Sequence, residues 1–241
     1  MPGQSVVLSG SASRVCWTSP FVNNTKPTRV LITGFEPFGG STLNPSQAII
    51  EAIESKTISF AEVKLCTALL PVDTSAVYTD IASLWKRHDP DVVLHLGESA
   101  RADRLTLERV ALNLLDFDLP DNAGKLIHDE QVDPAGPPAR FVTLPVRVLR
   151  DRLGHCGIQT TLSLSAGAYL CNQVLYLSLA QAQQQGGRMV GFIHVPSLPE
   201  QVKSGERQAP AMPLEQLIEQ VRTLILQAID LFEDDESSKR H

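Results

Sequence analysis

Hydrophobic positions recur with two different periods along this chain, and the two periods alternate. Short, apolar, β-branched runs such as residues 30–33 and 92–96 are typical of strands buried on both faces of a sheet. Longer segments such as residues 74–88 place apolar residues at helical spacing. Strands and helices that alternate in this way predict an α/β fold, a three-layer α/β/α sandwich with a mainly parallel, twisted central sheet.

The predicted elements begin at Arg29 and continue almost to the end of the chain. Strand-like runs lie at 29–35, 62–72, 91–97, 105–115, 160–165 and 188–195. Helix-like runs lie at 44–56, 74–88, 146–154, 169–185 and 214–232. We therefore expect one domain over residues 29–233, which is long enough to bury one substantial core.

Three segments lack such a pattern. Residues 1–28 scatter Ser, Gly, Asn and Pro without a period and carry no acidic side chain, so we expect a flexible N-terminal extension. Residues 119–138 are rich in Pro, Asp, Asn and Gly and predict a long surface loop near one sheet edge. Residues 234–241 are predicted to be a polar C-terminal tail.

The composition restricts the binding partners and the cellular compartment that we expect for this protein. The 241 residues carry a net charge of −6 without a basic block, which argues against nucleic acid or an anionic membrane as the main partner. No apolar run approaches the roughly 20 residues of a membrane-spanning helix, and the N-terminus lacks a signal-peptide pattern. The cysteines, at positions 16, 66, 156 and 171, form neither a disulfide scaffold nor a C-x-x-C pair. We expect a cytoplasmic protein without a metal ion.

Cys171 occupies the setting of a reactive thiol. It follows the small residues of the run SAGAYLCN (165–172) and stands where a long helical pattern begins. At a helix N-terminus the helix dipole and the free backbone N–H groups lower the pKa of a thiol and can hold an oxyanion. The alternative is a buried structural cysteine, because cysteine is among the most buried residue types, and position alone does not decide between them.

His194 and Glu108 are the candidate partners of that thiol. His194 ends the strand-like run 188–195, where a catalytic base is expected in this architecture. His95 lies in the middle of a buried run and is predicted to be a hydrogen-bonded core residue. Glu108 stands beside Arg109 in an apolar stretch, a costly position unless the carboxylate is paired or orients an imidazole. A purely structural Glu108–Arg109 pair is the alternative. No catalytic role is expected for the remaining histidines, at positions 88, 128, 155 and 241.

Four segments together carry a family resemblance. They are TGFEPFGG (33–40) with NPS (44–46), ERVALN (108–113), AGAYLCN (166–172) and GFIHVPSLPEQ (191–201). In this order they resemble the pyroglutamyl peptidase I, or pyrrolidone-carboxylate peptidase, family of cysteine peptidases. The likeness extends from about residue 29 to residue 202.

The resemblance implies an activity and a site. It implies a cysteine exopeptidase that hydrolyses the amide bond after an N-terminal pyroglutamyl residue of peptides, through a triad of Glu108, Cys171 and His194 and a thioester, without metal or cofactor. Phe35 and Phe38 are expected to form apolar walls around the pyrrolidone ring. The other substrate-binding residues it implies are Asn44, Tyr169 and Leu170. The resemblance also implies a homo-oligomer, commonly a tetramer.

The chain departs from the family pattern at one strand end. The family usually reads G-Q-x-G-G-R there, whereas this chain reads Gly97-Glu98-Ser99-Ala100-Arg101-Ala102. An ionised glutamate only accepts hydrogen bonds, whereas a glutamine also donates them. Glu98 is nevertheless expected at the substrate, either through its side chain or through the loop backbone, and the loop is expected to set substrate preference.

Two other functions fit the same residues. A divergent thiol amidase would keep the triad and act on another small cyclic or blocked acyl group. A non-catalytic binding protein would keep the fold and the substrate site without the reaction. Release of a fluorophore from pyroglutamyl-aminomethylcoumarin distinguishes the peptidase from both.

Overall fold

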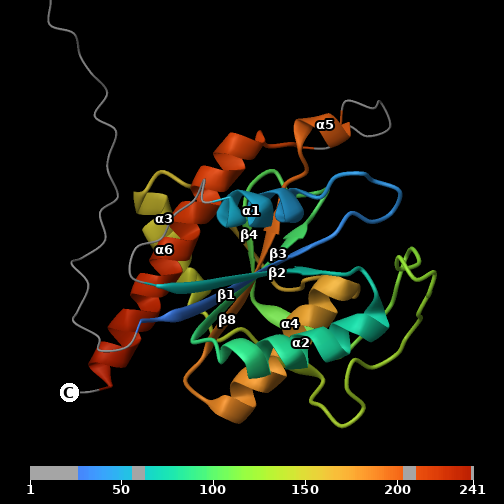
Figure 1. Cartoon of the computed structure of the whole chain (residues 1–241), viewed down its shortest axis with the longest axis horizontal. Helices are drawn as coiled ribbons and strands as arrows, with labels where there is room; N and C mark the ends of the chain where they lie inside the picture. The colour runs from blue at the N-terminus through green and yellow to red at the C-terminus, as the bar shows by residue number, and fades with distance from the viewer. Residues whose placement is uncertain (1–26, 56–62, 203–209, 240–241) are drawn as a thin grey trace, which may run out of the picture.

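A six-stranded sheet in the order β2-β1-β3-β8-β4-β7 forms the centre of the molecule (Figure 1). The computed structural model describes residues 27–55, 63–202 and 210–239. The strands of the sheet are β1 (Arg29–Phe35), β2 (Lys64–Leu70), β3 (Val92–Glu98), β4 (Thr106–Glu108), β7 (Thr161–Ser163) and β8 (Met189–Val195). The first four strands of that order are mutually parallel, which confirms the mainly parallel sheet of an α/β fold.

The predicted run 105–115 is divided between two sheets. Its first part, β4, pairs with β8 in antiparallel orientation and with β7 in parallel orientation. Its second part, β5 (Val110–Leu112), forms a separate antiparallel pair with β6 (Ala139–Phe141). Arg109 lies between them, where its N–H donates to the Ser163 carbonyl and its carbonyl accepts from Val142. The hydrophobic pattern indicates extended structure but does not mark this change of partner.

Helices cover both faces of the sheet, as predicted (Figure 1). One face packs against α2 and α4, and the other against α1, α3 and α6. The helices are α1 (Pro45–Glu54), α2 (Thr74–His88), α3 (Val146–His155), α4 (Leu170–Gln185), α5 (Pro199–Val202) and α6 (Leu214–Ser238). Two helix starts have side-chain caps: Asn44 accepts from the Ser46 N–H at α1, and Asp73 accepts from the Ser75 and Ala76 N–H groups at α2.

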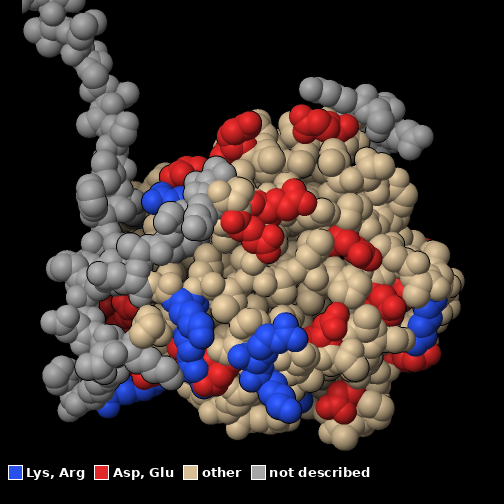
Figure 2. All heavy atoms as spheres, viewed as in Figure 1, with Lys and Arg blue, Asp and Glu red and all other residues tan. Residues whose placement is uncertain are grey.

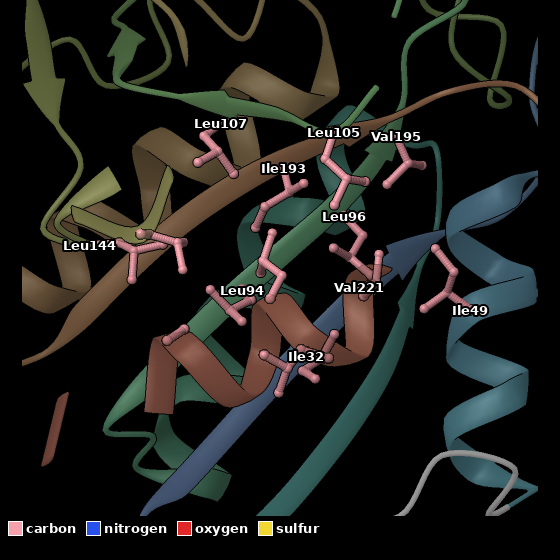
Figure 3. Packing of buried hydrophobic residues seen from close by; sticks show 14 of the residues in the cluster. Ile32, Ile49, Leu94, Leu96, Leu105, Leu107, Leu144, Ile193, Val195 and Val221 are labelled. Carbon is pink, nitrogen blue, oxygen red and sulfur yellow. The ribbon is translucent and has the colours of Figure 1, made fainter. Parts of the chain in front are cut away.

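Alternation along the strands sorts the core into two layers. Ile32, Leu94 and Ile193 lie on neighbouring strands and point toward α1 and α6, where Ile49 and Val221 meet them (Figure 3). All five side chains are buried. Burial of such side chains stabilises a fold by about 1.5–3 kcal/mol each. This layer fixes which strand residues face the opposite side of the sheet, where α4 lies.

His95 anchors the second layer. Its ring lies completely buried between strands and helix, with Nδ1 at 2.7 Å from the Thr33 hydroxyl and Nε2 at 2.7 Å from the Ser178 hydroxyl. Burial lowers the pKa of His95 to about 3, so the ring stays neutral. The Trp85 indole also donates to Ser178, at 3.3 Å. The prediction of a hydrogen-bonded core histidine is confirmed.

The chain boundaries differ slightly from the expected ones. Thr28, which the sequence pattern assigns to the extension, is buried, and its hydroxyl donates to Glu233 on α6 at 2.9 Å. Helix α6 continues to Ser238, into the expected polar tail. Residues 1–26 of the predicted extension lie outside the described residues. Within the described ranges, no helix has the length and apolarity needed to cross a bilayer.

Charged side chains are distributed unevenly over one face of the molecule. In the space-filling view, acidic side chains are spread across this face, whereas basic ones lie in a few separate groups (Figure 2). Among the described residues that this view shows, the basic side chains form no continuous stripe.

A glycine at the packing of α1 on β1 provides a test of the fold. A Cβ on Gly34 would lie 2.7 Å from the Ser46 carbonyl oxygen, so a side chain there forces the α1 backbone away. We expect Gly34→Ala to lower the free energy of unfolding by about 1–3 kcal/mol. Gly154→Ala is the control: its Cβ meets nothing within 4 Å on α3, and alanine should stabilise that helix by up to about 1 kcal/mol. Thermal unfolding followed by circular dichroism measures both, and an unchanged Tm for Gly34→Ala would contradict the packing.

Candidate active site

The carboxyl ends of β3 and β8 meet the start of α4. Gly97 and His194 are register partners on these two neighbouring strands. A Cβ added to Gly97 would lie only 3.0 Å from the Cys171 sulfur and 2.7 Å from the Phe192 ring. The thiol therefore packs directly against the backbone of β3, beside the strand that carries His194. A side chain at Gly97 would displace either the thiol or the aromatic ring.

Glu108 and His194 form a buried pair. The Nδ1 atom of His194 lies 2.8 Å from Glu108 Oε1, and only 3% of the Glu108 side-chain surface and 11% of that of His194 are exposed. The antiparallel pairing of β4 with β8 places Thr106 opposite His194. Glu108 lies two residues further along β4, so it points to the same face of the sheet as Thr106. A carboxylate buried this deeply is stable only with a strong partner. Glu108 has one in the imidazole.

The neighbours of His194 favour its charged form. Burial alone would lower its pKa, but a hydrogen bond and charge interaction with Cys171, together with the Glu108 carboxylate, outweigh burial and raise the pKa of His194 to about 9. Because Nδ1 faces Glu108, Nε2 is the nitrogen left for the sulfur. The structure thus brings together all three residues that the sequence predicted, in the order carboxylate, imidazole, thiol.

Helix α4 fixes the position of the thiol. Tyr169 is its extended N-cap and Leu170 its first residue, so Cys171 lies in the first turn as predicted. The side chain of Asn172 accepts from the Leu112 N–H at 2.7 Å and donates to the Leu112 and Leu114 carbonyls at 2.8 and 2.9 Å. This amide ties the helix start to the chain that follows Glu108. The first backbone N–H groups of a helix lack intrahelical acceptors and are suited to hold an anion.

Aromatic side chains lie close to the thiol. Phe35 packs against Phe192, with ring centroids 6.5 Å apart. Phe38 lies 6.1 Å from Tyr169, whose ring meets Phe117 edge-on at 4.5 Å. The Tyr169 hydroxyl donates to the Pro120 carbonyl at 3.2 Å, which ties the N-cap of α4 to the loop at 119–138. Burial, with the charges of Asp121 and Cys171, raises the pKa of Tyr169 to about 12, so the phenol stays protonated.

Three further residues predicted to bind the substrate have side chains that contact other parts of the protein. Asn44 caps α1 and donates to the Glu36 carbonyl at 3.0 Å, so its side chain serves the loop after β1. Leu170 is buried in the core layer of α2 and α4. The carboxylate of Glu98 accepts from Ser197 at 2.6 Å and from Gln201 at 3.0 and 3.1 Å. The side chains of these three residues are thus all engaged within the protein.

Sequence reasoning missed several residues at the site. Gly97 was expected only as the end of a strand, and Phe117 lay in a stretch without a clear period. No role was predicted for Asn122, nor for four residues that lie within the segments of the family resemblance: Glu36, Asn172, Ser197 and Gln201. The one sequence signal for Gly97 is its position directly before the loop at 98–102, because glycine allows another group to approach the backbone closely.

The loop at 119–138 reaches back to the strand ends. Asn122 donates from its side chain to Glu36 Oε1 at 2.8 Å and to the Pro37 carbonyl at 2.9 Å. Its backbone N–H donates to the Val72 carbonyl at 2.8 Å, just beyond the edge strand β2. The loop therefore lies at a sheet edge, as predicted, and is fastened to the segment that carries Phe38. Among the residues that the structure describes, no group of three or more His, Cys, Asp or Glu side chains is arranged to hold a metal ion.

The fold and the grouped thiol, imidazole and carboxylate place the chain in the class of cysteine hydrolases. A family profile described as pyroglutamyl peptidase matches residues 28–231, which is most of the chain. The chain therefore belongs to the pyroglutamyl peptidase family of cysteine peptidases.

Relatives and solved structures agree with this assignment. The pyrrolidone-carboxylate peptidase of Pyrococcus furiosus is 38% identical over 206 residues, which covers 84% of this chain and 98% of that protein. That of Chromobacterium violaceum is 41% identical over 172 residues, with 71% and 79% covered. The structure of the pyrrolidone carboxyl peptidase from Thermococcus litoralis superposes with a TM-score of 0.81 at 34% identity, over 86% of this chain and 96% of that one.

Alkylation distinguishes the two free thiols of the described chain, Cys66 and Cys171, which are both partly exposed. We expect iodoacetamide at pH 7 to label Cys171 at least tenfold faster than Cys66, because only Cys171 lies at a helix start beside His194. Peptide mass spectrometry after timed quenching measures both rates in one sample, and Cys66 is the internal control. Equal rates would show that the Cys171 thiol is not activated.

Proposed function

We propose that this protein removes an N-terminal pyroglutamyl residue from peptides by nucleophilic catalysis at Cys171. The observation that carries the proposal is the buried Glu108–His194 pair, with its imidazole beside the Cys171 sulfur, in a chain of the pyroglutamyl peptidase family. The relatives named above are pyrrolidone-carboxylate peptidases, and that of Pyrococcus furiosus is matched over 98% of its length. A thiol with a base and a group that orients the base is the arrangement that nucleophilic catalysis requires.

The first half of the reaction forms a thioester. The proton of the Cys171 thiol resides on His194, and the thiolate attacks the pyroglutamyl carbonyl carbon to give a tetrahedral oxyanion. The first N–H groups of α4 stabilise that oxyanion. Collapse of the intermediate breaks the amide bond, and the imidazolium of His194 donates its proton to the leaving amine. Glu108 keeps the imidazole oriented and stabilises its positive charge throughout.

The second half restores the enzyme. His194, now neutral, takes a proton from water as the water attacks the thioester carbonyl. The second tetrahedral intermediate releases pyroglutamate, and the thiolate of Cys171 is regenerated beside the imidazolium. His194 accepts every proton that leaves the thiol or the water. Glu108 orients this imidazole and therefore affects both halves of the reaction.

The surroundings of the thiol suit a small, uncharged ring. Phe38 and Phe117 pack on Tyr169 at the start of α4, Phe35 packs on Phe192, and aromatic surfaces can desolvate a five-membered lactam. The ring still needs a donor and an acceptor for its C=O and N–H. Since the Glu98 carboxylate is held by Ser197 and Gln201, the main chain at Glu98 is the better candidate. A cytoplasmic location and a homo-oligomeric state, commonly a tetramer in the family, are part of the same proposal.

Substitutions at the triad test the mechanism. With pyroglutamyl-aminomethylcoumarin as substrate, we expect Cys171→Ala to abolish hydrolysis and His194→Ala to lower kcat/KM by about 10²–10⁴-fold. Glu108→Gln should cost less than His194→Ala, because its role is to orient the base. Cys66→Ser should keep most of the activity. An active His194→Ala enzyme with an inactive His95→Ala enzyme of native stability would mean that the other histidine is the base.

The raised pKa of His194 predicts a pH dependence. Relative to an unfolded pKa near 6.5, a folded pKa of about 9 contributes stability that is fully present below pH 6.5 and is lost as pH rises through 9. Because the imidazolium protonates the leaving amine, kcat/KM should also fall as pH rises through about 9. In Glu108→Gln this alkaline limb should move to lower pH, since the Glu108 carboxylate, which raises the pKa of His194 together with Cys171, is gone. Rates from pH 6 to 10 measure it, and a limb that Glu108→Gln does not move would exclude the assigned role.

A further inference from the structure

One carboxylate joins two strand ends next to the thiol. Glu98 is the last residue of β3, and its Oε1 atom accepts from the Ser197 hydroxyl at 2.6 Å. The Nε2 atom of Gln201 lies 3.1 Å from Oε1 and 3.0 Å from Oε2 of the same carboxylate. Ser197 is buried and lies two residues after the end of β8, while Gln201 lies in the short helix α5. We call these three side chains the Glu98 clamp.

The Glu98 clamp reaches a third strand end through Gln201. The Oε1 atom of Gln201 accepts from the Leu198 N–H at 2.7 Å, and its Nε2 atom also lies 3.3 Å from the Leu43 carbonyl in the loop after β1. The carboxyl ends of β1, β3 and β8 are therefore tied together by one amide and one carboxylate. These are the strand ends that carry Phe35, Gly97 and His194.

The Glu98 side chain lies on the other side of β3 from the thiol. Successive residues of a strand point to opposite faces of a sheet, and Gly97 faces the Cys171 sulfur. Glu98 therefore points toward the face covered by α1 and α6, where Ser197 and Gln201 meet it. This geometry disfavours direct contact between the carboxylate and a substrate at the thiol. It leaves the carboxylate free to act on the backbone that carries His194.

A carboxylate suits this position better than an amide. Two donors, the Ser197 hydroxyl and the Gln201 amide, converge on the side chain, and an ionised carboxylate accepts both without offering a donor of its own. A glutamine would present one oxygen to these donors and turn its NH₂ group toward one of them. A glutamate at position 98 thus matches the donors that surround it.

We propose that Glu98 is a positioning residue for His194. Through Ser197 and Gln201 it holds the segment after β8 in register with β3, which keeps the imidazole beside the Cys171 sulfur. The backbone contributes to the same register, since the Ser99 N–H donates to the Val195 carbonyl at 2.9 Å. The proposal rests on the proposed function only for its activity readout. The effect on the thiol can be measured without any substrate.

The test compares Glu98→Ala and Ser197→Ala with the wild-type full chain. The rate of Cys171 alkylation by iodoacetamide at pH 7, where the thiol depends on His194, should fall at least threefold in both variants. At pH 10, where thiols ionise without help, it should be unchanged. With pyroglutamyl-aminomethylcoumarin, kcat should fall about tenfold and KM should change less than twofold. The double variant should be no worse than Glu98→Ala alone, because both changes open the same clamp.

Two matched variants separate positioning from general stability. Glu233→Ala removes the carboxylate that accepts from Thr28 at the opposite end of β1, so it should lower Tm without changing the alkylation rate at pH 7. Glu98→Gln keeps one acceptor and should stay within about threefold of the wild type in both readouts. An unchanged alkylation rate at pH 7 in both Glu98→Ala and Ser197→Ala, or a rise in KM alone, would overturn the proposal. If the wild type fails to hydrolyse the substrate, the proposed function is wrong, and the alkylation rates still decide the role of Glu98.

Discussion

The buried contact between Glu108 and His194 is the constraint on which the rest of the site depends. A carboxylate with 3% of its surface exposed destabilises a fold unless a partner compensates for its lost hydration. The protein supplies that partner by running β4 antiparallel to β8, against the direction of the other pairs at the sheet centre. The chain then leaves the sheet at Arg109 to form β5. The chain thus changes partner directly after Glu108, and the carboxylate lies beside the imidazole at the end of its strand.

The parallel strands of the sheet determine where the thiol lies relative to His194. The carboxyl ends of β1, β3 and β8 lie side by side because their registers are parallel, and the start of α4 approaches the same edge. Gly97 lets the sulfur of Cys171 touch the strand backbone, which brings the thiol within reach of a histidine on the next strand. Neutral His95 lies two residues earlier on β3 and bonds Ser178 of α4. The same strand and helix are thus joined by a hydrogen bond two strand residues before the point where the thiol packs on Gly97.

Local sequence patterns predicted most of the fold, and they predicted Cys171 and His194 as candidate site residues. The bounds of α2 at Thr74–His88 coincide with the apolar period, and β8 ends at the expected residue, Val195, and begins one residue later than expected. Cys171 and His194 stand at element ends, which periodicity locates well. Glu108 was a candidate because a charged residue in an apolar stretch needs a partner, but its pairing with His194, 86 residues away, is a long-range contact that no local pattern indicates. The β5–β6 pair, Phe117 and Gln201 share that difficulty, since each acquires its role only from long-range contacts.

The departure of residues 98–102 from the family pattern leaves the reactive groups untouched for a structural reason. Strand alternation directs Glu98 away from the thiol, and its donors, Ser197 and Gln201, belong to the segment that follows His194. Beyond Glu98, the chain turns immediately, with the Ala102 N–H donating to the Ser99 carbonyl at 3.0 Å and Ala102 itself buried. A change of side chain here can therefore alter how firmly the strand ends are joined while Glu108, His194 and Cys171 keep their contacts. Under the proposed function, sequence divergence at this loop changes the support of His194 and leaves the contacts among Glu108, His194 and Cys171 in place.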